Sequence, residues 1–205
     1  MAPETGSSPI TLPAPDRQGT VPLETALTAR RSVRAFAPTS LSLPQVSQLL
    51  WSAQGITGPY GVRTAPSAGA LYPLETLLVA GAVDGLAAGL YRYAPREHTV
   101  AAVQTEDLRP RLFAAALEQG CVANAAVSIV LGAEYGRATG KYGERGQRYT
   151  IMEVGHAAQN VCLQAVTLGL ASVLVGAFKD EEVKKLAQMG PDEDPLYIIS
   201  VGPTV

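Results

Sequence analysis

One stretch in the second half of the chain constrains the fold most. It runs from Gly146 to Gly169, GQRYTIMEVGHAAQNVCLQAVTLG, and its apolar residues recur every three or four positions. The apolar positions are Ile151, Val154, Ala158, Val161, Ala165 and Leu168. This spacing predicts one long helix with an apolar stripe. Gly155 and the alanines would let another helix approach closely, so the helix is expected either inside one chain or at a subunit interface.

Shorter helices and strands are predicted on both sides of this helix. In SLPQVSQLLWSAQG, Ser42 and Gln45 can form a capping box and Gly55 can stop the helix. Pro22 suits the first turn of a helix in VPLETALTARRS. Helices are also expected in EDLRPRLFAAALEQG, with Pro110 in the first turn, and in KDEEVKKLAQM, whose first turn is acidic. Strand patterns occur in LETLLVAG, GLYRYAPREHTVAAV (a hairpin), AAVSIVLGA, SVLVGAF and PLYIISVG. Helices and strands do not alternate strictly, so the predicted class is α+β.

The length and charge of the chain limit its domain count and its partners. A chain of 205 residues suits one domain, with residues 1–20 as an extended arm and residues 21–205 as the folded domain. The net charge of −2 argues against nucleic acid or an anionic membrane as a partner. No apolar run is long enough to span a bilayer. The N-terminus lacks the features of a signal peptide, so we expect a cytoplasmic protein.

Several catalytic chemistries lack their residues. The sequence contains no Gly-x-Gly-x-x-Gly after a strand, no Walker loop, no Gly-x-Ser-x-Gly and no His-Glu-x-x-His. Of the two histidines, His98 is expected to be solvated at the hairpin turn, and His156 to be a hydrogen-bonded structural residue of the long helix. Cys121 and Cys162 are interpreted as small buried residues. We therefore predict neither a triad hydrolase nor a metal site.

Four segments are compatible with ligand binding instead. In ARRSVRAF, Arg30, Arg31 and Arg34 surround Ser32, which suits a phosphate or a carbonyl-rich ring, although a solvated helix end is the simpler explanation of that segment alone. The loop TAPSAGALYP has little side-chain bulk, so a flat ligand could approach its backbone. Gly176 follows a strand, where its N–H could face a ligand. The segment GKYGERGQRY gathers the basic and aromatic residues Lys141, Tyr142, Arg145, Arg148 and Tyr149.

Five motifs that follow one another along the chain are together more specific than any of these segments alone. They are Arg-Arg-Ser-Val-Arg, RTAPSAGALYPLE, KYGERGQRYTIMEVGHAAQN, GLASVLVGAF and EDPLYIISVG. In this order the chain resembles the SagB-type dehydrogenases of the nitroreductase superfamily, from about Leu23 to Gly202. The resemblance implies an α+β fold with a mixed sheet flanked by helices, and an intertwined homodimer with the long helix at its interface. It also implies that FMN is bound non-covalently, at the interface between the two subunits.

The resemblance assigns roles to three groups of residues. Arg30, Ser32 and Arg34 match positions that hold the phosphate and the pyrimidine edge of the flavin, with Arg31 contributing through its backbone. Pro66, Ser67, Ala68 and Gly69 match the loop that reaches the flavin from the partner subunit. Leu174, Val175 and Gly176 match the strand end behind the flavin ring, with the Gly176 N–H near flavin N5. On this interpretation the loop needs no reactive side chain, because FMN supplies the chemistry.

The reaction implied by the resemblance is ping-pong hydride transfer through flavin N5. The donor would be NADH or NADPH, and the acceptor a small molecule such as a nitroaromatic or a quinone. Members that oxidise azoline rings in peptides use a Lys-Tyr pair, which Lys141 and Tyr142 match as acid and base. The alternative is that Lys141 is solvated and Tyr142 packs at the interface. An azoline dehydrogenase and a flavin-binding protein without turnover therefore stay open as alternatives.

The chain departs from the resemblance at one point. Many nitroreductases bind the flavin phosphate with basic residues of a C-terminal extension, whereas this sequence ends at Val205. The phosphate is then expected to depend on the first arginine cluster, or on Arg145 or Arg148.

Overall fold

The computed structural model describes residues 8–205, so the first seven residues of the arm expected at 1–20 lie outside the described residues. The helices are α1 Leu23–Ala29, α2 Leu43–Gln54, α3 Arg109–Ala115, α4 Gly120–Ala123, α5 Tyr135–Tyr142, α6 Arg145–Thr167 and α7 Asp180–Leu186. The strands are β1 Ile10–Thr11, β2 Leu41–Ser42, β3 Leu74–Ala80, β4 Val83–Asp84, β5 Gly89–Ala94, β6 Thr99–Gln104, β7 Val127–Glu134, β8 Leu170–Val175 and β9 Glu193–Pro203. Two 3₁₀ turns, η1 Pro59–Gly61 and η2 Ala68–Ala70, lie between α2 and β3.

Seven strands form the central sheet, in the order β1-β6-β5-β3-β7-β9-β8. Neighbouring strands of this sheet are antiparallel. Parallel pairing occurs between β2 and β4 and at the isolated bridge of Ser32 to Ser172, beside β8. The hairpin around Pro95 is confirmed as β5 and β6. The fold class is confirmed as α+β, with a sheet flanked by helices.

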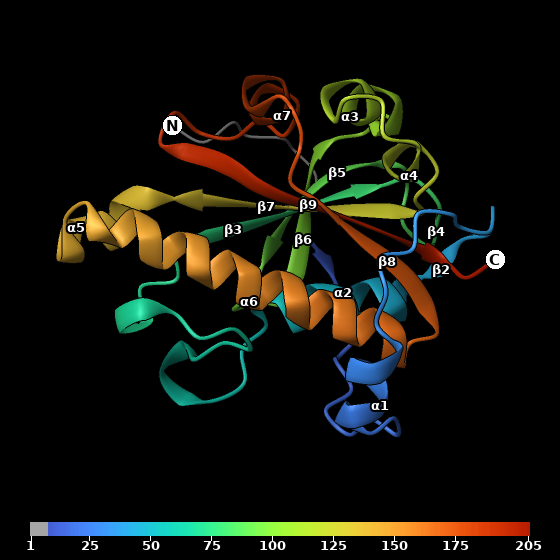
Figure 1. The fold of residues 1–205 in the computed structure, drawn as a ribbon, viewed down its shortest axis with the longest axis horizontal. Coiled ribbons are helices and arrows are strands. Elements are labelled where there is room, and N and C mark those ends of the chain that lie inside the picture. The colour runs from blue at the N-terminus through green and yellow to red at the C-terminus, as the bar shows by residue number, and fades with distance from the viewer. Residues whose placement is uncertain (1–7) are drawn as a thin grey trace.

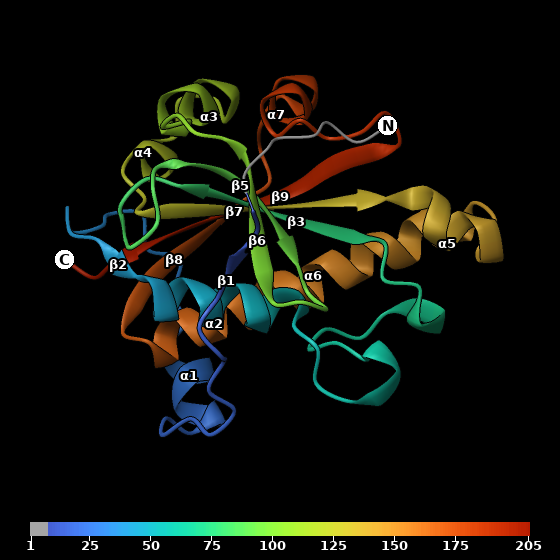
Figure 2. The ribbon, with the colours of Figure 1, turned by 180° about the vertical axis from the view of Figure 1, so that it is seen from behind.

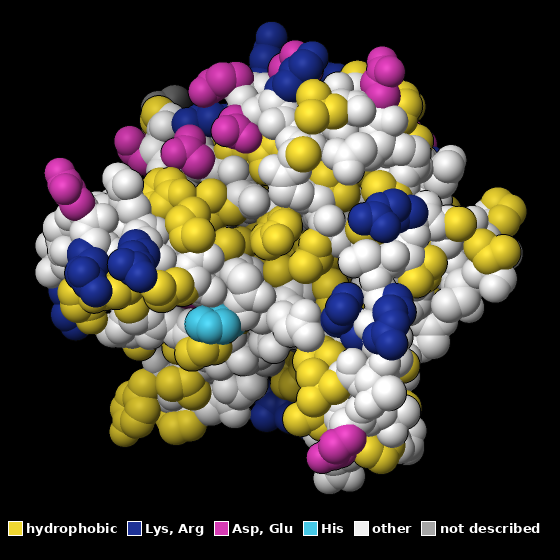
Figure 3. Space-filling model, viewed as in Figure 1, with side chains coloured by type: hydrophobic (Ala, Val, Ile, Leu, Met, Phe, Trp, Pro, Cys, Tyr) yellow, Lys and Arg dark blue, Asp and Glu magenta, His cyan; other side chains and the backbone are white. Residues whose placement is uncertain are grey.

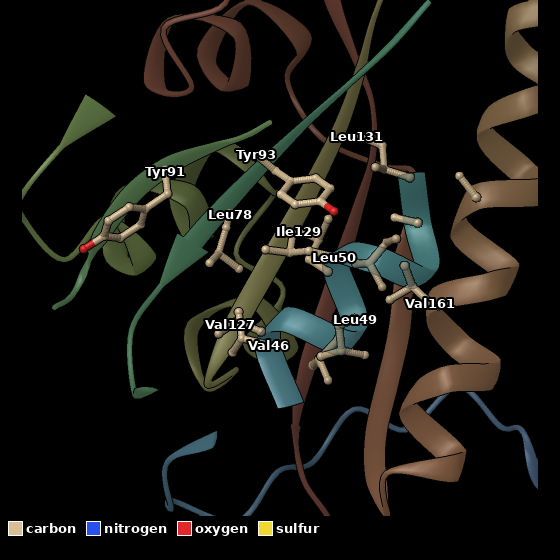
Figure 4. Packing of buried hydrophobic residues seen from close by; sticks show 14 of the residues in the cluster. Val46, Leu49, Leu50, Leu78, Tyr91, Tyr93, Val127, Ile129, Leu131 and Val161 are labelled. Atoms are coloured by element: carbon tan, nitrogen blue, oxygen red, sulfur yellow. The ribbon is translucent and has the colours of Figure 1, made fainter. Parts of the chain in front are cut away.

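Helices cover both faces of the sheet. In Figures 1 and 2, α2 and α6 lie on one face, and α3, α4 and α7 lie on the other. The central strands are apolar at consecutive positions because both of their faces are buried. In β7, Ile129 and Leu131 pack with Leu49 and Leu50 of α2, as Figure 4 shows, while Val130 faces the second cluster with Leu112 of α3. The sheet thus separates two hydrophobic cores.

Helix α2 forms as its sequence predicts. The backbone N–H of Ser42 donates to Gln45 Oε1 at 2.9 Å, and the Gln45 N–H donates to Ser42 Oγ at 3.4 Å, which completes the capping box. Gly55 is the C-terminal cap, but its φ of −64° is available to any residue. Glycine is required there for steric reasons, because a Cβ at Gly55 would lie 2.0 Å from the Trp51 ring.

Helix α6 confirms the long helix, and its stripe differs from the prediction at one residue. Val154, Ala158, Val161 and Ala165 are buried against the sheet, whereas Ile151 is 50% exposed. The same pattern appears in α1, where Ala26 is buried while Leu23 and Leu27 are exposed. Apolar spacing predicts a helix in both cases. Which apolar residues meet the core depends on where the neighbouring elements lie.

Helix α3 begins with Pro110 in its first turn, as predicted, but it is shorter than the pattern EDLRPRLFAAALEQG suggests. Leu117 and Glu118 adopt φ values of +56° and +55°, which no α-helix accommodates. The acidic first turn of α7, with Asp180, Glu181 and Glu182, is confirmed.

The described part of the arm joins the domain through hydrogen bonds. Strand β1 pairs with β6, and Leu12 is buried in the core. His98 Nε2 lies 2.8 Å from Ser47 Oγ and 3.0 Å from the Pro13 carbonyl oxygen, and Nδ1 lies 2.9 Å from the Tyr93 hydroxyl. The prediction of a solvated His98 is therefore wrong. Burial lowers the pKa of His98, and the hydrogen bond to Pro13 partly offsets that effect.

Candidate functional site

The arginine segment is held alongside the edge strand of the sheet. Ser32 forms a parallel bridge with Ser172 of β8, and the Val33 N–H donates to the Ser172 carbonyl oxygen at 3.0 Å. Below it, Phe36 packs on Gly202 of β9 so closely that a Cβ at Gly202 would lie 2.8 Å from Phe36 Cβ. These contacts place the segment beside the first half of β8, at Ala171 and Ser172.

The three arginines of this segment differ in what they bind. Arg31 folds back on α1, where Nη1 donates to the carbonyl oxygens of Thr28 and Arg30 at 2.9 and 2.8 Å. Within residues 8–205, neither the Arg30 nor the Arg34 guanidinium has a hydrogen bond or ion pair. Their donors are available to an anion. Figure 3 shows Lys and Arg side chains gathered on this face, beside the place of α1 and β8.

The end of β8 completes this half of the candidate site. Leu174 is half-buried, Val175 is buried, and Gly176 is exposed just after the strand. The Gly176 N–H makes no hydrogen bond to any residue that the structure describes. We call Arg30, Ser32, Arg34, Leu174, Val175 and Gly176 the β8 group. It combines two free guanidinium groups with a hydroxyl and a free backbone donor.

The long loop between α2 and β3 is folded rather than irregular. Ile56 and Arg63 form an antiparallel bridge, and the Thr57 N–H donates to the Val62 carbonyl oxygen at 2.9 Å. The Thr64 N–H donates to the Gly55 carbonyl oxygen at 3.0 Å. Tyr60 at the tip is fully exposed, with a φ of +62°. The loop is thus a projection held by its own backbone hydrogen bonds, visible beside α6 in Figure 1.

Pro66 to Gly69 lie in the second half of that loop, against the end of α5. Ser67 Oγ accepts the Tyr72 N–H at 2.9 Å, and the Ser67 carbonyl oxygen accepts the Ala70 N–H at 3.1 Å. Gly69 has a φ of +64°, and a Cβ there would lie 2.7 Å from Tyr142 Oη and 3.0 Å from Lys141 Nζ. The loop and the Lys-Tyr pair therefore meet within one chain. We call Pro66, Ser67, Ala68, Gly69, Lys141 and Tyr142 the loop group.

Ion pairs hold α5 and the end of this loop to the sheet. Arg137 of α5 donates to Glu75 Oε1 at 2.6 Å and to the Tyr72 carbonyl oxygen at 3.1 Å. Arg92 of β5 donates to Glu75 Oε2 at 2.9 Å and to Glu193 Oε2 at 3.0 Å. The charged partners hold the pKa of both arginines high against the effect of burial. Lys141 lies one turn after Arg137 on the helix that this network holds to the sheet.

Sequence reasoning missed a buried acid beneath the loop. Glu153 of α6 is 2% exposed, and burial raises the pKa of its carboxyl from an ordinary 4.5 to about 7. The Ser67 hydroxyl and the Arg63 guanidinium oppose that rise. A signal was present, since Glu153 directly precedes Val154 and lies one turn before Ala157 on the apolar side of the helix. A charged residue in an apolar stripe marks either a partner or a function.

The two groups lie at opposite ends of α6. Glu153, next to Ser67, and Cys162, whose thiol is close enough to Arg30 to be influenced by its charge, are nine residues apart. The helical rise makes this about 14 Å along the axis. In Figure 1 the loop and α5 lie near one end of α6, whereas α1 and the start of β8 lie near the other. One chain therefore does not bring the two groups together.

The face of α6 between the two groups is open and partly apolar. Ile151 and Met152 are about half exposed, Gly155 and His156 are exposed, and a Cβ at Gly155 would contact nothing within 4 Å. Figure 3 shows hydrophobic side chains across the middle of this face. The interpretation of His156 as a hydrogen-bonded structural residue is wrong, because its side chain lies on this open face.

A cavity of about 590 Å³ lies elsewhere, between residues 14–21, α1, α2 and the second half of α6. Trp51, Asn160 and Gln164 line it, and no residue of the β8 group or the loop group does. Both cysteines are buried and unpaired, as expected, and burial raises the pKa of each thiol. Across residues 8–205, no three His, Cys, Asp or Glu side chains are grouped to hold a metal ion.

Comparison with known proteins identifies the family. The sequence model described as the nitroreductase family matches residues 27–203. The chain belongs to the nitroreductase family. It is therefore an oxidoreductase with a nitroreductase fold, as the fold and the five motifs predict. None of the described helices combines the length and the apolar character needed to cross a membrane.

Two relatives match this nitroreductase-family chain over most of its length. A protein of Methanocaldococcus jannaschii, provisionally named a nitroreductase, is 42% identical over 182 residues, which is 89% of this chain and 91% of that protein. A crystal structure from Ralstonia eutropha, also provisionally named a nitroreductase, has a TM-score of 0.86 at 30% identity. The match covers 98% of this chain and 91% of that one. The whole domain, including the described arm, therefore has structural counterparts.

A third relative is a peptide-processing protein. The microcin B17-processing protein McbC of Escherichia coli is 31% identical over 153 residues, and the match covers 71% of this chain and 56% of McbC. A chain of the E. coli microcin synthetase McbBCD complex with truncated pro-MccB17 superposes with a TM-score of 0.73 at 26% identity, covering 95% of this chain and 78% of that one. The SagB-type resemblance is thereby confirmed.

Proposed function

We propose that this protein is an FMN-dependent oxidoreductase that carries hydride by a ping-pong reaction from NADH or NADPH to a small acceptor such as a nitroaromatic or a quinone. The observation that carries the proposal is the separation of the two groups of site residues along α6. A flavin between them needs both groups, and a second copy of the chain would supply the missing one. The open apolar face of α6 suits that second copy.

The donor set of the β8 group fits FMN. Two unpaired guanidinium groups suit a phosphate and the carbonyl oxygens of a pyrimidine edge, which assigns Arg30, Ser32 and Arg34 to those parts. Leu174 and Val175 provide an apolar backing for a flat ring. The loop of the second copy, Pro66 to Gly69, has the small side chains that let its backbone lie against the other side of the ring.

When bound, FMN would supply the hydride chemistry of both half-reactions. The residues of this chain then have electrostatic tasks. Arg34 provides positive charge where negative charge develops, and the free N–H of Gly176 provides a fixed hydrogen-bond donor. No side chain has to act as a nucleophile, so acceptors of varied shape can be accommodated.

A visible absorption spectrum is the first test. The protein is incubated with FMN, desalted, and measured before and after addition of NADPH. We expect a retained flavin band that bleaches with NADPH and returns with a quinone. Arg30→Ala and Arg34→Ala should lose the flavin on desalting, whereas Arg111→Ala, which removes an exposed ion pair with Glu106, should retain it.

The other possible outcomes of that test each support a different alternative to the proposed function. A band that persists in NADPH and with quinones would indicate a flavin-binding protein without this turnover, or an enzyme whose reductant is its own substrate. Wild-type protein that retains no flavin would refute the assignment of the β8 group.

The contact of Lys141 and Tyr142 with Gly69 favours a second candidate, an azoline dehydrogenase. McbC, the relative named for processing of microcin B17, matches most of the present chain. Oxidation of an azoline to an azole removes one hydride, which FMN would take, and one ring proton, which Lys141 or Tyr142 would take. A peptide carrying an azoline ring, incubated with the FMN-loaded protein and an acceptor, tests this. Azole product that forms with wild type and not with Lys141→Ala supports this function. Absence of azole product with both proteins excludes it.

A further inference from the structure

Glu153 is a buried acid with an incomplete set of partners. It lies on the face of α6 toward the loop and sheet, and its Oε1 has no hydrogen bond to any described residue. Arg63, in the first half of the loop, is similarly placed, because its Nε is buried and unpaired while Nη1 donates to Gln54 Oε1 at 2.7 Å. The two side chains form no direct ion pair in residues 8–205. A buried carboxyl without an ion pair is costly as an anion.

The Ser67 hydroxyl is the hydrogen-bonding group that faces this carboxyl from the loop. One lone pair of Ser67 Oγ is occupied, because it accepts the Tyr72 N–H at 2.9 Å. The hydroxyl hydrogen and the second lone pair are left for Glu153 and for a ligand. What Ser67 presents to a ligand therefore depends on what Glu153 takes.

The two protonation states of Glu153 have opposite consequences for Ser67. An ionised carboxyl only accepts, so it takes the hydroxyl hydrogen and leaves Ser67 able to accept from a ligand. A protonated carboxyl can donate to the second lone pair of Ser67 Oγ, which frees the hydroxyl hydrogen for a ligand. Both states are accessible near neutrality, since burial raises the pKa of Glu153 to about 7.

The charged surroundings of Glu153 are simple. Arg63 faces it from the loop and favours the anion, as does the Ser67 hydroxyl. Glu75, Tyr72 and Arg137 surround Arg63 from β3, the loop and α5, and act on that guanidinium. Burial lowers the pKa of Arg63, and Glu75 and Glu153 oppose that shift. Ser67 is thus the neighbouring group of the loop through which a change in the protonation of Glu153 acts most directly.

We propose that Glu153 is a positioning residue that sets the hydrogen-bond direction of Ser67, so that the loop offers a donor to its ligand when the carboxyl is protonated and only an acceptor when it is ionised. This inference rests on the proposed function, which places Ser67 at FMN bound between two copies of the chain. Since FMN presents mainly acceptor atoms along its ring edge, binding should be tighter with Glu153 protonated.

The first experiment measures the dissociation constant of FMN by fluorescence quenching from pH 5.5 to 8.5. The ratio of the wild-type constant to that of Glu153→Gln removes the titration of FMN itself. We expect the ratio to rise about fivefold through pH 7, the effect of one hydrogen bond, because Gln can donate to Ser67 at every pH. Ser67→Ala should bind more weakly and lose this pH dependence. Glu144→Gln, the same change at the exposed start of α6, should behave as wild type.

The second experiment needs no FMN. Carbon-13 labelled glutamate reports the titration of Glu153 in the flavin-free protein, with the Glu153→Gln spectrum assigning the signal. Loss of the hydroxyl donor in Ser67→Ala should move the midpoint upward. An unmoved midpoint, or an FMN ratio that is flat with pH, overturns the inference. Wild-type protein that binds no FMN refutes the proposed function instead, while the flavin-free titration still decides whether Glu153 and Ser67 are coupled.

Discussion

The hydroxyl of Tyr142 lies against the backbone of Gly69, where a Cβ atom would be 2.7 Å from Tyr142 Oη. The end of α5 and the small-residue loop therefore fit together because position 69 has no side chain. This contact joins two segments that are more than 70 residues apart in the sequence. It also gives the small residues of the loop a reason that does not depend on a cofactor.

Gly69→Ala should disturb this contact beyond the ordinary effect of a side chain at positive φ. Gly85→Ala is the matched control, because Gly85 has a φ of +83° and nothing within 4 Å of an added Cβ. Each substitution should lower the free energy of unfolding by about 1 kcal/mol, the strain of the left-handed region. Gly69→Ala alone should also weaken FMN binding, since Tyr142 and the loop must move apart. Equal FMN affinities in the two variants would contradict this.

Glu153 should make the protein more stable at mildly acidic pH. The folded state holds a proton on Glu153 between pH 4.5 and about 7, whereas the unfolded chain does not. The stabilisation is therefore complete below pH 4.5 and lost as the pH rises through 7, by about 3 kcal/mol in total. Urea unfolding of wild type and Glu153→Gln across this range measures the difference. Parallel stability curves for the two proteins would exclude a proton held by Glu153.

The open face of α6 should be required for assembly. Ile151→Asp places a charge on this face and should yield a monomer in analytical ultracentrifugation, whereas we expect wild type to sediment as a dimer. Leu117→Asp is the control, because Leu117 is 53% exposed, much like Ile151, but lies beyond α3 on the other side of the sheet. The monomer should also lose FMN on desalting. A dimer that survives Ile151→Asp would place the interface elsewhere.

Gly202→Ala should affect the arginine segment through packing. The added Cβ would lie 2.8 Å from Phe36 Cβ, a part of the side chain that cannot rotate away. We expect a loss of about 1–3 kcal/mol in stability, as for other overpacked sites, and weaker FMN binding because residues 30–34 shift with Phe36. Gly136→Ala in α5, with nothing within 4 Å, should be neutral or stabilising. Denaturant unfolding and FMN titration measure both effects.

Arg145 and Arg148 test how the FMN phosphate is held. Both are exposed near the start of α6, and Arg145 Nε donates to the Tyr149 hydroxyl at 2.8 Å. If either contributes to phosphate binding from the second copy, its change to Ala should raise the dissociation constant of FMN several-fold and leave that of riboflavin unchanged. Unchanged FMN constants in both variants would leave Arg30 and Arg34 as the phosphate ligands.

Local patterns in the sequence predicted the secondary structure because the interactions behind them are local. The capping box of Ser42 and Gln45, the acidic first turn of α7 and the buried strand β7 depend on residues a few positions apart. The α+β class and the family followed from such patterns and from five short motifs. The acid at Glu153 could also have been noticed, since it interrupts the apolar stripe of α6.

The sequence by itself determined most of the longer helices and strands, although not α5, and which residue types could meet a flavin. Only the tertiary structure decided how these segments are used. Ile151 is exposed because none of residues 8–205 covers that side of α6. His98 is half-buried because Pro13 and Ser47 approach it. The β8 group and the loop group lie apart because a rigid helix of 23 residues separates them. Such distances arise from contacts between residues remote in the sequence, which local periodicity does not encode.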